Sequence, residues 1–146
     1  MIDQRIIDVL NELLGAEQSY LLPRLAESGI FVAGPSTNDH VVIERMMGAN
    51  ARRREALASL IIESGGAPAP RETDLESADL HFQQPDLLLP RLLESTRAIA
   101  AKYERAAGRV SAQMSAASLI AQHNAEHKAD VASLESMVAG ATNATA

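Results

Sequence analysis

Residues 37–70 read TNDHVVIERMMGANARRREALASLIIESGGAPAP, and their pattern indicates a helical fold. Its apolar residues recur at three- and four-residue spacing, the pattern of a long helix with one buried face, namely Val42, Ile43, Met46, Met47, Leu57, Leu60 and Ile61. Thr37 and Asn38 are both good caps for the start of this helix. We expect Gly65-Gly66 to end the helix, because the prolines that follow prevent it from resuming.

A long segment without helical periodicity follows, from Gly65 to about Gln84. It has roughly 20 residues, whereas connections within helix bundles usually have about two to eight. A connection of this length can run along the whole bundle, so that the helices before and after it lie parallel. Leu80 and Phe82 are expected to pack on the bundle.

The rest of the chain has the same helical pattern. One helix is expected to begin near Ile6 and to be kinked by Pro23 or to end shortly after it. Another starts around Pro85-Asp86, and the last starts from about Ser111. We therefore predict an all-α fold: residues 1–140 form a four-helix bundle with a long crossover at about 65–85 between its second and third helices, and residues 141–146 form a disordered tail.

Composition narrows the possible functions. The 146 residues are 47% hydrophobic but only 3% aromatic, and their formal charge is −6, which argues against a nucleic-acid partner. There is no cysteine, so disulfides and thiolate metal sites are excluded. No apolar run approaches the roughly 18 residues of a membrane span, and the first residues lack a secretion signal. We expect a cytoplasmic protein that binds neither nucleic acid nor membrane.

Several polar side chains are predicted to point into the bundle. With a turn of about 100° per residue, the apolar face centres near Glu17 in the first helix and near Asn50 in the second, where Arg53 and Arg54 lie towards its two edges. In the fourth helix it centres on His127. The polar residues near these centres form a predicted buried polar layer of Glu17, Asn50, Arg54, Asn124 and His127.

The third helix places Ser95 and Thr96 inward, while Glu94 points nearly the opposite way. Tyr20 and Tyr103 could line the same polar layer, but we interpret them as amphipathic core residues whose hydroxyls lie near the surface.

This layout resembles the ferritin-like superfamily, which places a Glu on helices 1 and 3 and Glu-x-x-His on helices 2 and 4. Glu17 and His127 match two of the six ligands. The segment from Asn50 to Leu57, followed by Gly65-Gly66, also resembles the second helix of bacterial ferritin-like proteins such as bacterioferritin and rubrerythrin.

The other four ligand positions depart from the family pattern. Helix 2 reads Met47-x-x-Asn50, helix 4 reads Asn124-x-x-His127, and helix 3 offers Ser95 or Thr96 instead of a Glu. A di-iron centre needs about four carboxylates, so the resemblance implies a degenerate site that has lost the di-iron oxidase activity.

Two main interpretations follow. In the first, Glu17 is held by Asn50, His127 and one of the two arginines, no cofactor is bound, and the protein is more an interaction or scaffold module than an enzyme. In the second, Glu17, His123 and His127 bind one Fe, Mn or Zn ion, because histidines four residues apart can reach the same metal. A small-molecule pocket between the helices is a third possibility. A homodimer or another protein partner is expected because ferritin-like bundles commonly pair.

Overall fold

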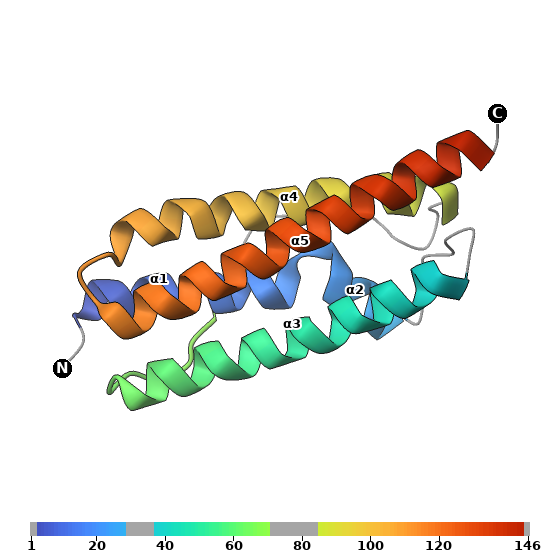
Figure 1. The fold of residues 1–146 in the computed structure, drawn as a ribbon. Helices are drawn as coiled ribbons and strands as arrows, with labels where there is room; N and C mark the ends of the chain where they lie inside the picture. Colours follow the sequence, from blue (N-terminus) through green and yellow to red (C-terminus); the bar gives the residue numbers. More distant parts are fainter. Residues whose placement is uncertain (1–2, 29–36, 71–84, 145–146) are drawn as a thin grey trace.

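A computed structural model describes residues 3–28, 37–70 and 85–144 (Figure 1). The described part is helical, without strands, and its helices are α1 (Gln4–Ser19), α2 (Leu21–Ser28), α3 (Thr37–Glu63), α4 (Pro85–Arg109) and α5 (Met114–Ala144). The all-α prediction is confirmed, and α1 and α2 together make the first rod of a four-helix bundle.

The order of the helices fits a long crossover. α3 and α4 both run opposite to α1, and α5 runs back in the direction of α1 (Figure 1). α3 ends at one end of the bundle and α4 begins at the other (Figure 1), as the predicted parallel arrangement of these two helices requires. The predicted contacts of Leu80 and Phe82 lie outside the described residues.

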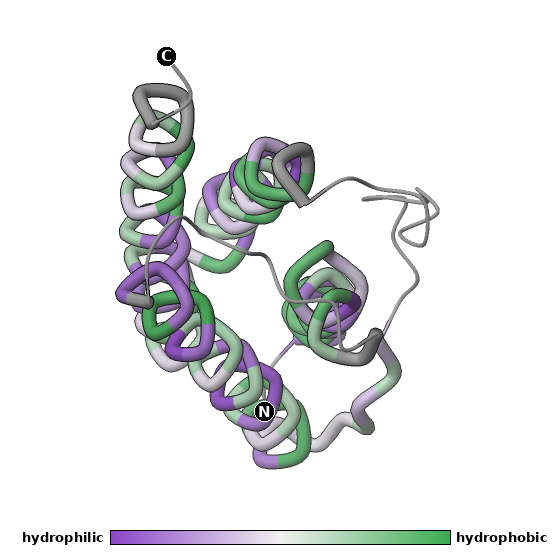
Figure 2. Tube along the Cα trace, turned by 90° about the vertical axis from the view of Figure 1, so that its right-hand side faces the viewer, coloured by the Kyte–Doolittle hydropathy of each residue, from purple (hydrophilic) through white to green (hydrophobic). Residues whose placement is uncertain are grey.

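Seen nearly along the helix axes, the four rods surround a shared core (Figure 2). α4 packs most extensively on α5, and α1 packs on α3, whereas α3 and α5 contact each other much less. The core is built almost wholly from Leu, Ile, Val, Met and Ala side chains, as the composition requires. The seam between α3 and α5 is therefore the loosest side of the bundle.

The first rod breaks before Pro23, at Tyr20. Tyr20 is extended, with ψ of 174°, and α2 starts at the next residue. Pro23 has no N–H and its ring would clash with the Ser19 carbonyl in a continuous helix, so the chain restarts with Pro23 in the first turn. The side chain of Ser95 accepts the Leu21 N–H at 2.9 Å, which satisfies a donor exposed by this break.

Gly65 ends α3 with φ of +91°, the left-handed conformation that glycine adopts most easily. Its N–H donates to the Ile62 carbonyl at 3.0 Å, and the Gly66 N–H donates to Ile61 at 3.0 Å. These two bonds form the double C-cap that places the start of the crossover against α1. There the buried Asn11 side chain accepts the Ala69 N–H at 2.7 Å.

Both ends of the last helix differ from the sequence prediction. α5 begins at Met114 rather than near Ser111, because the Gln113 side chain caps it by accepting the Ser115 N–H at 2.9 Å. It continues to Ala144, so residues 141–144, which we assigned to a disordered tail, are helical. Alanine is the best helix former, and Ala141 and Ala144 favour this extension.

Candidate functional site: a carboxylate held by four helices

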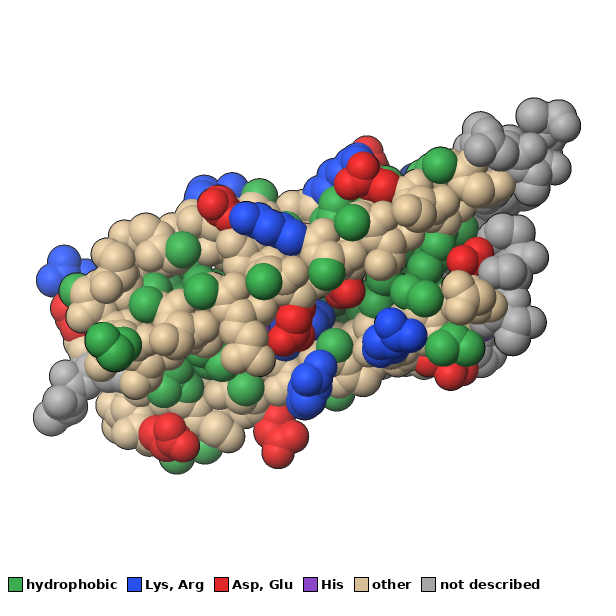
Figure 3. Space-filling model, in the orientation of Figure 1, with side chains coloured by type: hydrophobic (Ala, Val, Ile, Leu, Met, Phe, Trp, Pro, Cys, Tyr) green, Lys and Arg blue, Asp and Glu red, His purple; other side chains and the backbone are tan. Residues whose placement is uncertain are grey.

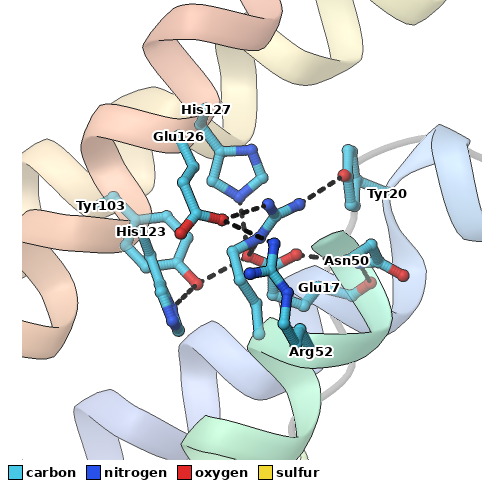
Figure 4. Close-up of polar contacts among 9 residues, drawn as sticks. Glu17, Tyr20, Asn50, Arg52, Tyr103, His123, Glu126 and His127 are labelled. Carbon is cyan, nitrogen blue, oxygen red and sulfur yellow. Dashed lines mark hydrogen bonds and ion pairs between the residues drawn. The ribbon is translucent and has the colours of Figure 1, made fainter. Parts of the chain in front are cut away.

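The carboxylate of Glu17 lies in the middle of the bundle, with the side chain fully buried. Four donors from three other helices surround it (Figure 4): Asn50 and Arg53 come from α3, Tyr103 from α4 and His127 from α5. All four side chains are at most 2% exposed. The site therefore joins α1 to the other three long helices through one acidic group.

Each oxygen of this carboxylate has its own partners. Oε1 accepts from Asn50 Nδ2 at 2.9 Å. Oε2 accepts from Arg53 Nε at 2.9 Å and from the Tyr103 hydroxyl at 2.7 Å, and it lies 2.7 Å from His127 Nε2. Oε2 therefore has one more donor than its two lone pairs, whereas Oε1 has a single side-chain donor and keeps one lone pair.

Arg53 extends the network beyond Glu17. Its Nη1 donates to Glu126 Oε1 at 3.0 Å, and its Nη2 donates to the Tyr20 hydroxyl at 3.2 Å. The side chain is 1% exposed, although it carries a full positive charge. The guanidinium therefore bridges two carboxylates, one fully buried and one towards the surface of α5.

The hydrogen bonds also assign the imidazole protons. Glu17 accepts, so His127 Nε2 must carry a proton, and the Tyr103 hydroxyl gives its only proton to Glu17. His123 Nδ1 lies 3.3 Å from that hydroxyl and must then be the donor. His123 thus reaches Glu17 through Tyr103 and not directly.

The pKa shifts agree with this pattern of donors. Burial alone raises the pKa of Glu17, but the hydrogen bond and charge of His127, together with Arg53 and Tyr103, lower it to about 2. Burial lowers the pKa of His123 to about 4, so this ring is neutral at pH 7. Burial, reinforced by the charge of Glu17, raises the pKa of both Tyr20 and Tyr103 well above the usual value, so both phenols stay protonated.

The structure brings together three of the five residues of the predicted polar layer, Glu17, Asn50 and His127. Arg54 does not join them: it is half-buried, and its place is taken by Arg53. Arg53 and Arg54 lie at the two edges of the inward face of α3, and the edge that carries Arg53 faces α5. Asn124 also lies outside the layer, where its Nδ2 donates to Glu104 at 2.7 Å.

The hydroxyls of Tyr20 and Tyr103 do not lie near the surface, as we had interpreted them from the sequence. Both are fully buried, and their hydroxyls lie in the polar layer rather than near the surface. Both rings pack on the imidazole of His127, with ring centroids 5.7 Å away for Tyr20 and 5.1 Å for Tyr103. Tyr103 is therefore the α4 residue that donates to Glu17. Ser95 and Thr96, the inward polar residues predicted for this helix, are buried but form hydrogen bonds with backbone atoms.

The register of the second helix also differs from the sequence prediction. The α3 side chains that meet Glu17 are Asn50 and Arg53, three residues apart, in the spacing of a Glu-x-x-His pair. We had placed Met47 and Asn50 at these positions. The i, i+3 spacing from Asn50 to Arg53 was a signal in the sequence that could have identified the arginine.

These residues do not fit a metal centre of the ferritin type. Among residues 3–28, 37–70 and 85–144, no three or more His, Cys, Asp or Glu side chains are grouped so that they could hold a metal ion. The guanidinium of Arg53 is in contact with Glu17, where a cation would have to bind. The set of Glu17, His123 and His127 does not converge either, since the hydroxyl of Tyr103 lies between His123 and the carboxylate.

Comparison with known proteins gives a fold but no close relative. No protein-family model matches the sequence, and no curated protein matches it significantly. A solved structure described as ferritin-like, diiron-carboxylate proteins from Bacillus anthracis str. Ames superposes with a TM-score of 0.74 at 17% identity. The alignment covers 92% of this chain and 96% of that one. Among the helices of the described residues, none has the length and apolar character that crossing a membrane requires.

The superposition over most of both chains shows that this chain has the ferritin-like four-helix fold.

Proposed function

We propose that this protein is a ferritin-like bundle that works without a di-iron centre, as a non-catalytic scaffold or interaction module in the cytoplasm. In this proposal the positive charge that metal ions bring to a ferritin-type site is supplied by Arg53. The observation that carries the proposal is the set of four protein donors around the Glu17 carboxylate, three of them on Oε2 and one of them the cation Arg53. A metal could bind Oε2 only if several of these donors moved away.

The chemistry of the donors supports the same conclusion. Asn50 is an amide and Arg53 a cation, so the two α3 residues that face Glu17 bring no negative charge for a metal. Tyr103 keeps its proton because burial raises its pKa. Glu17 and its four donors thus offer a metal one carboxylate and one imidazole, well short of the six ligands of the family pattern.

The competing function is a mononuclear metalloprotein that uses Glu17, His123 and His127. It is favoured by the two histidines, which lie one turn apart on α5 and are both buried next to the same carboxylate network. It requires Arg53 and Tyr103 to leave Glu17. The two proposals therefore differ in what happens to the ion pair when metal is offered.

Metal analysis separates them. We expect protein produced with added iron, manganese and zinc to contain far less than one equivalent of any metal, and His127→Ala to lose stability without releasing an ion. The purified protein should not oxidise ferrous iron faster than buffer does. About one metal per chain, lost in His127→Ala, would overturn the proposal, and so would oxidation of iron that depends on Glu17.

The interaction role needs a separate measurement. Light scattering after size exclusion reports whether the chain forms the homodimer that we expect or stays monomeric. A strict monomer that captures no protein through the intact bundle would remove the interaction module from the proposal, while leaving the absence of a di-iron centre in place.

A further inference from the structure

A pocket of about 270 Å³ opens in the loose seam between α3 and α5, beside the buried site. Its apolar lining comes from both helices and consists of Val42, Met46, Ala49 and Ala129. In Figure 3 apolar side chains lie between the two helices, and both basic and acidic groups border this seam. This volume lies just below the usual range of ligand pockets, about 300–1,000 Å³, which suits a molecule smaller than a drug.

The charged groups of this pocket are sorted by helix. Arg45, Arg52 and Arg53 line it from α3, and Glu126 and Asp130 line it from α5. Glu126 already has ion-pair partners, because its Oε1 lies 3.0 Å from Nη1 of Arg53 and 4.0 Å from Nη2 of Arg52. Arg45 and Asp130 are left: neither makes a hydrogen bond or an ion pair with any other described residue. The pocket thus carries one unpaired cation and one unpaired anion on opposite walls.

Without a ligand the cost falls on Asp130, because the Arg45 side chain is exposed to solvent. Asp130 is only partly exposed, and burial raises the pKa of its carboxyl despite the nearby charges of Arg53 and His127. A partly desolvated carboxylate gains from a cationic hydrogen-bond donor more than one in free water does. Arg45 offers a guanidinium, which matches a carboxylate with two parallel hydrogen bonds. The apolar part of the lining would exclude water from an uncharged group.

We propose that this pocket binds a small zwitterion with an apolar side chain, of the class of the aliphatic α-amino acids. Its ammonium group pairs with Asp130, its carboxylate pairs with Arg45, and its side chain contacts Val42 and Met46. The site lies beside the Glu17 network, and Arg53 and Glu126 belong to both, but it does not depend on the function proposed above.

Calorimetric titration of the full chain tests this with three probes that share one apolar group. The probes are L-leucine, isoamylamine, which lacks the carboxylate, and 4-methylpentanoate, which lacks the amine. We expect leucine to bind about tenfold more tightly than either analogue, since each charged hydrogen bond contributes about that factor. Saturable binding of leucine below about 10 mM is required for a ligand of this size.

Substitutions assign the two ends of the ligand. Asp130→Asn should weaken leucine and isoamylamine about tenfold and leave 4-methylpentanoate unchanged, and Arg45→Gln should do the reverse for the two analogues. Glu135→Gln is the matched control, because Glu135 is on the same helix but pairs with Arg97. Ala129→Leu adds bulk to a solvent-accessible wall of the pocket, so it should remove binding without disturbing the core.

Three results would overturn the proposal. They are the absence of saturable leucine binding, affinities that neither Asp130→Asn nor Arg45→Gln changes, and full binding by Ala129→Leu. Circular dichroism spectra show whether each variant keeps the helical content of the parent protein, so loss of binding is not confused with loss of fold.

Discussion

Replacement of Arg53 by methionine tests the central ion pair most directly. The change keeps an unbranched side chain in the core and removes the charge, so Glu17 is left ionised and buried without its cation. Three hydrogen bonds are lost together, to Glu17 at 2.9 Å, to Glu126 at 3.0 Å and to Tyr20 at 3.2 Å. Breaking a buried pair from one side typically costs about 3–5 kcal/mol. We expect a loss of that size in the free energy of unfolding.

The assay is urea unfolding followed by circular dichroism at reduced temperature, because this loss is a large part of the total stability of a small domain, about 5–15 kcal/mol. Arg52→Met is the matched control. The Arg52 side chain is 66% exposed and lies 4.0 Å from Glu126, so its removal should change stability by less than about 0.5 kcal/mol.

The double variant Glu17→Gln with Arg53→Met completes a thermodynamic cycle. It removes both charges, so its cost should be clearly smaller than the sum of the two single substitutions. A loss below about 1 kcal/mol for Arg53→Met would refute the reasoning. Strict additivity in the cycle would refute it as well, since it would mean that the two side chains do not interact.

Other predictions concern pH, the helix break and the glycines. The pKa of Glu17 is about 2 in the folded protein against an ordinary value of 4.5, so its contribution, about 3 kcal/mol, is complete above pH 4.5 and is lost as the pH falls from 4.5 through 2. His123 also has a depressed pKa, about 4 against 6.5, so stability already falls between pH 6.5 and 4, and His123→Gln should flatten the unfolding free energy in that range. Ser95→Ala leaves a buried N–H at the start of α2 without its acceptor and should cost about 1–3 kcal/mol by urea unfolding; an unchanged midpoint would mean that water replaces the hydroxyl. Gly65→Ala should lower the melting temperature, since φ is +91°, whereas Gly48→Ala, in the open interior of α3, should raise it; equal shifts would contradict the role of φ.

The helices could be predicted from the sequence because apolar spacing reports one buried face directly. The break at Tyr20 could not, since the apolar pattern of α1 continues into α2, where Leu21, Leu22 and Leu25 are all buried. A single extended residue changes the direction of the chain without interrupting that pattern. Only Pro23 marked the region, and its effect appears three residues before the ring.

The polar site was predictable to the level of the helix face but not of the atom. The apolar periodicity predicted that Glu17, Asn50 and His127 point into the bundle, and both Asn50 and His127 contact Glu17. It could not separate Arg53 from Arg54, because both lie at edges of the face and a long side chain can carry its charged head well away from its Cα atom. Tyr103 was assigned a surface hydroxyl for a similar reason: its donor role depends on a carboxylate 86 positions away in the sequence.

The arginine changes what the central carboxylate can do for the bundle. In a site filled by metal, the charge of the carboxylates is balanced only while the ion is bound, so the packing of the helices depends on metal supply. Here the balancing charge is part of α3, and its guanidinium lies against α1 and α5 at once. A shift of α3 by one residue would remove Arg53 from Glu17 and leave two buried charges unpaired. The ion pair therefore opposes alternative registers of the four helices in the presence or absence of metal, which is the property that a non-catalytic scaffold requires.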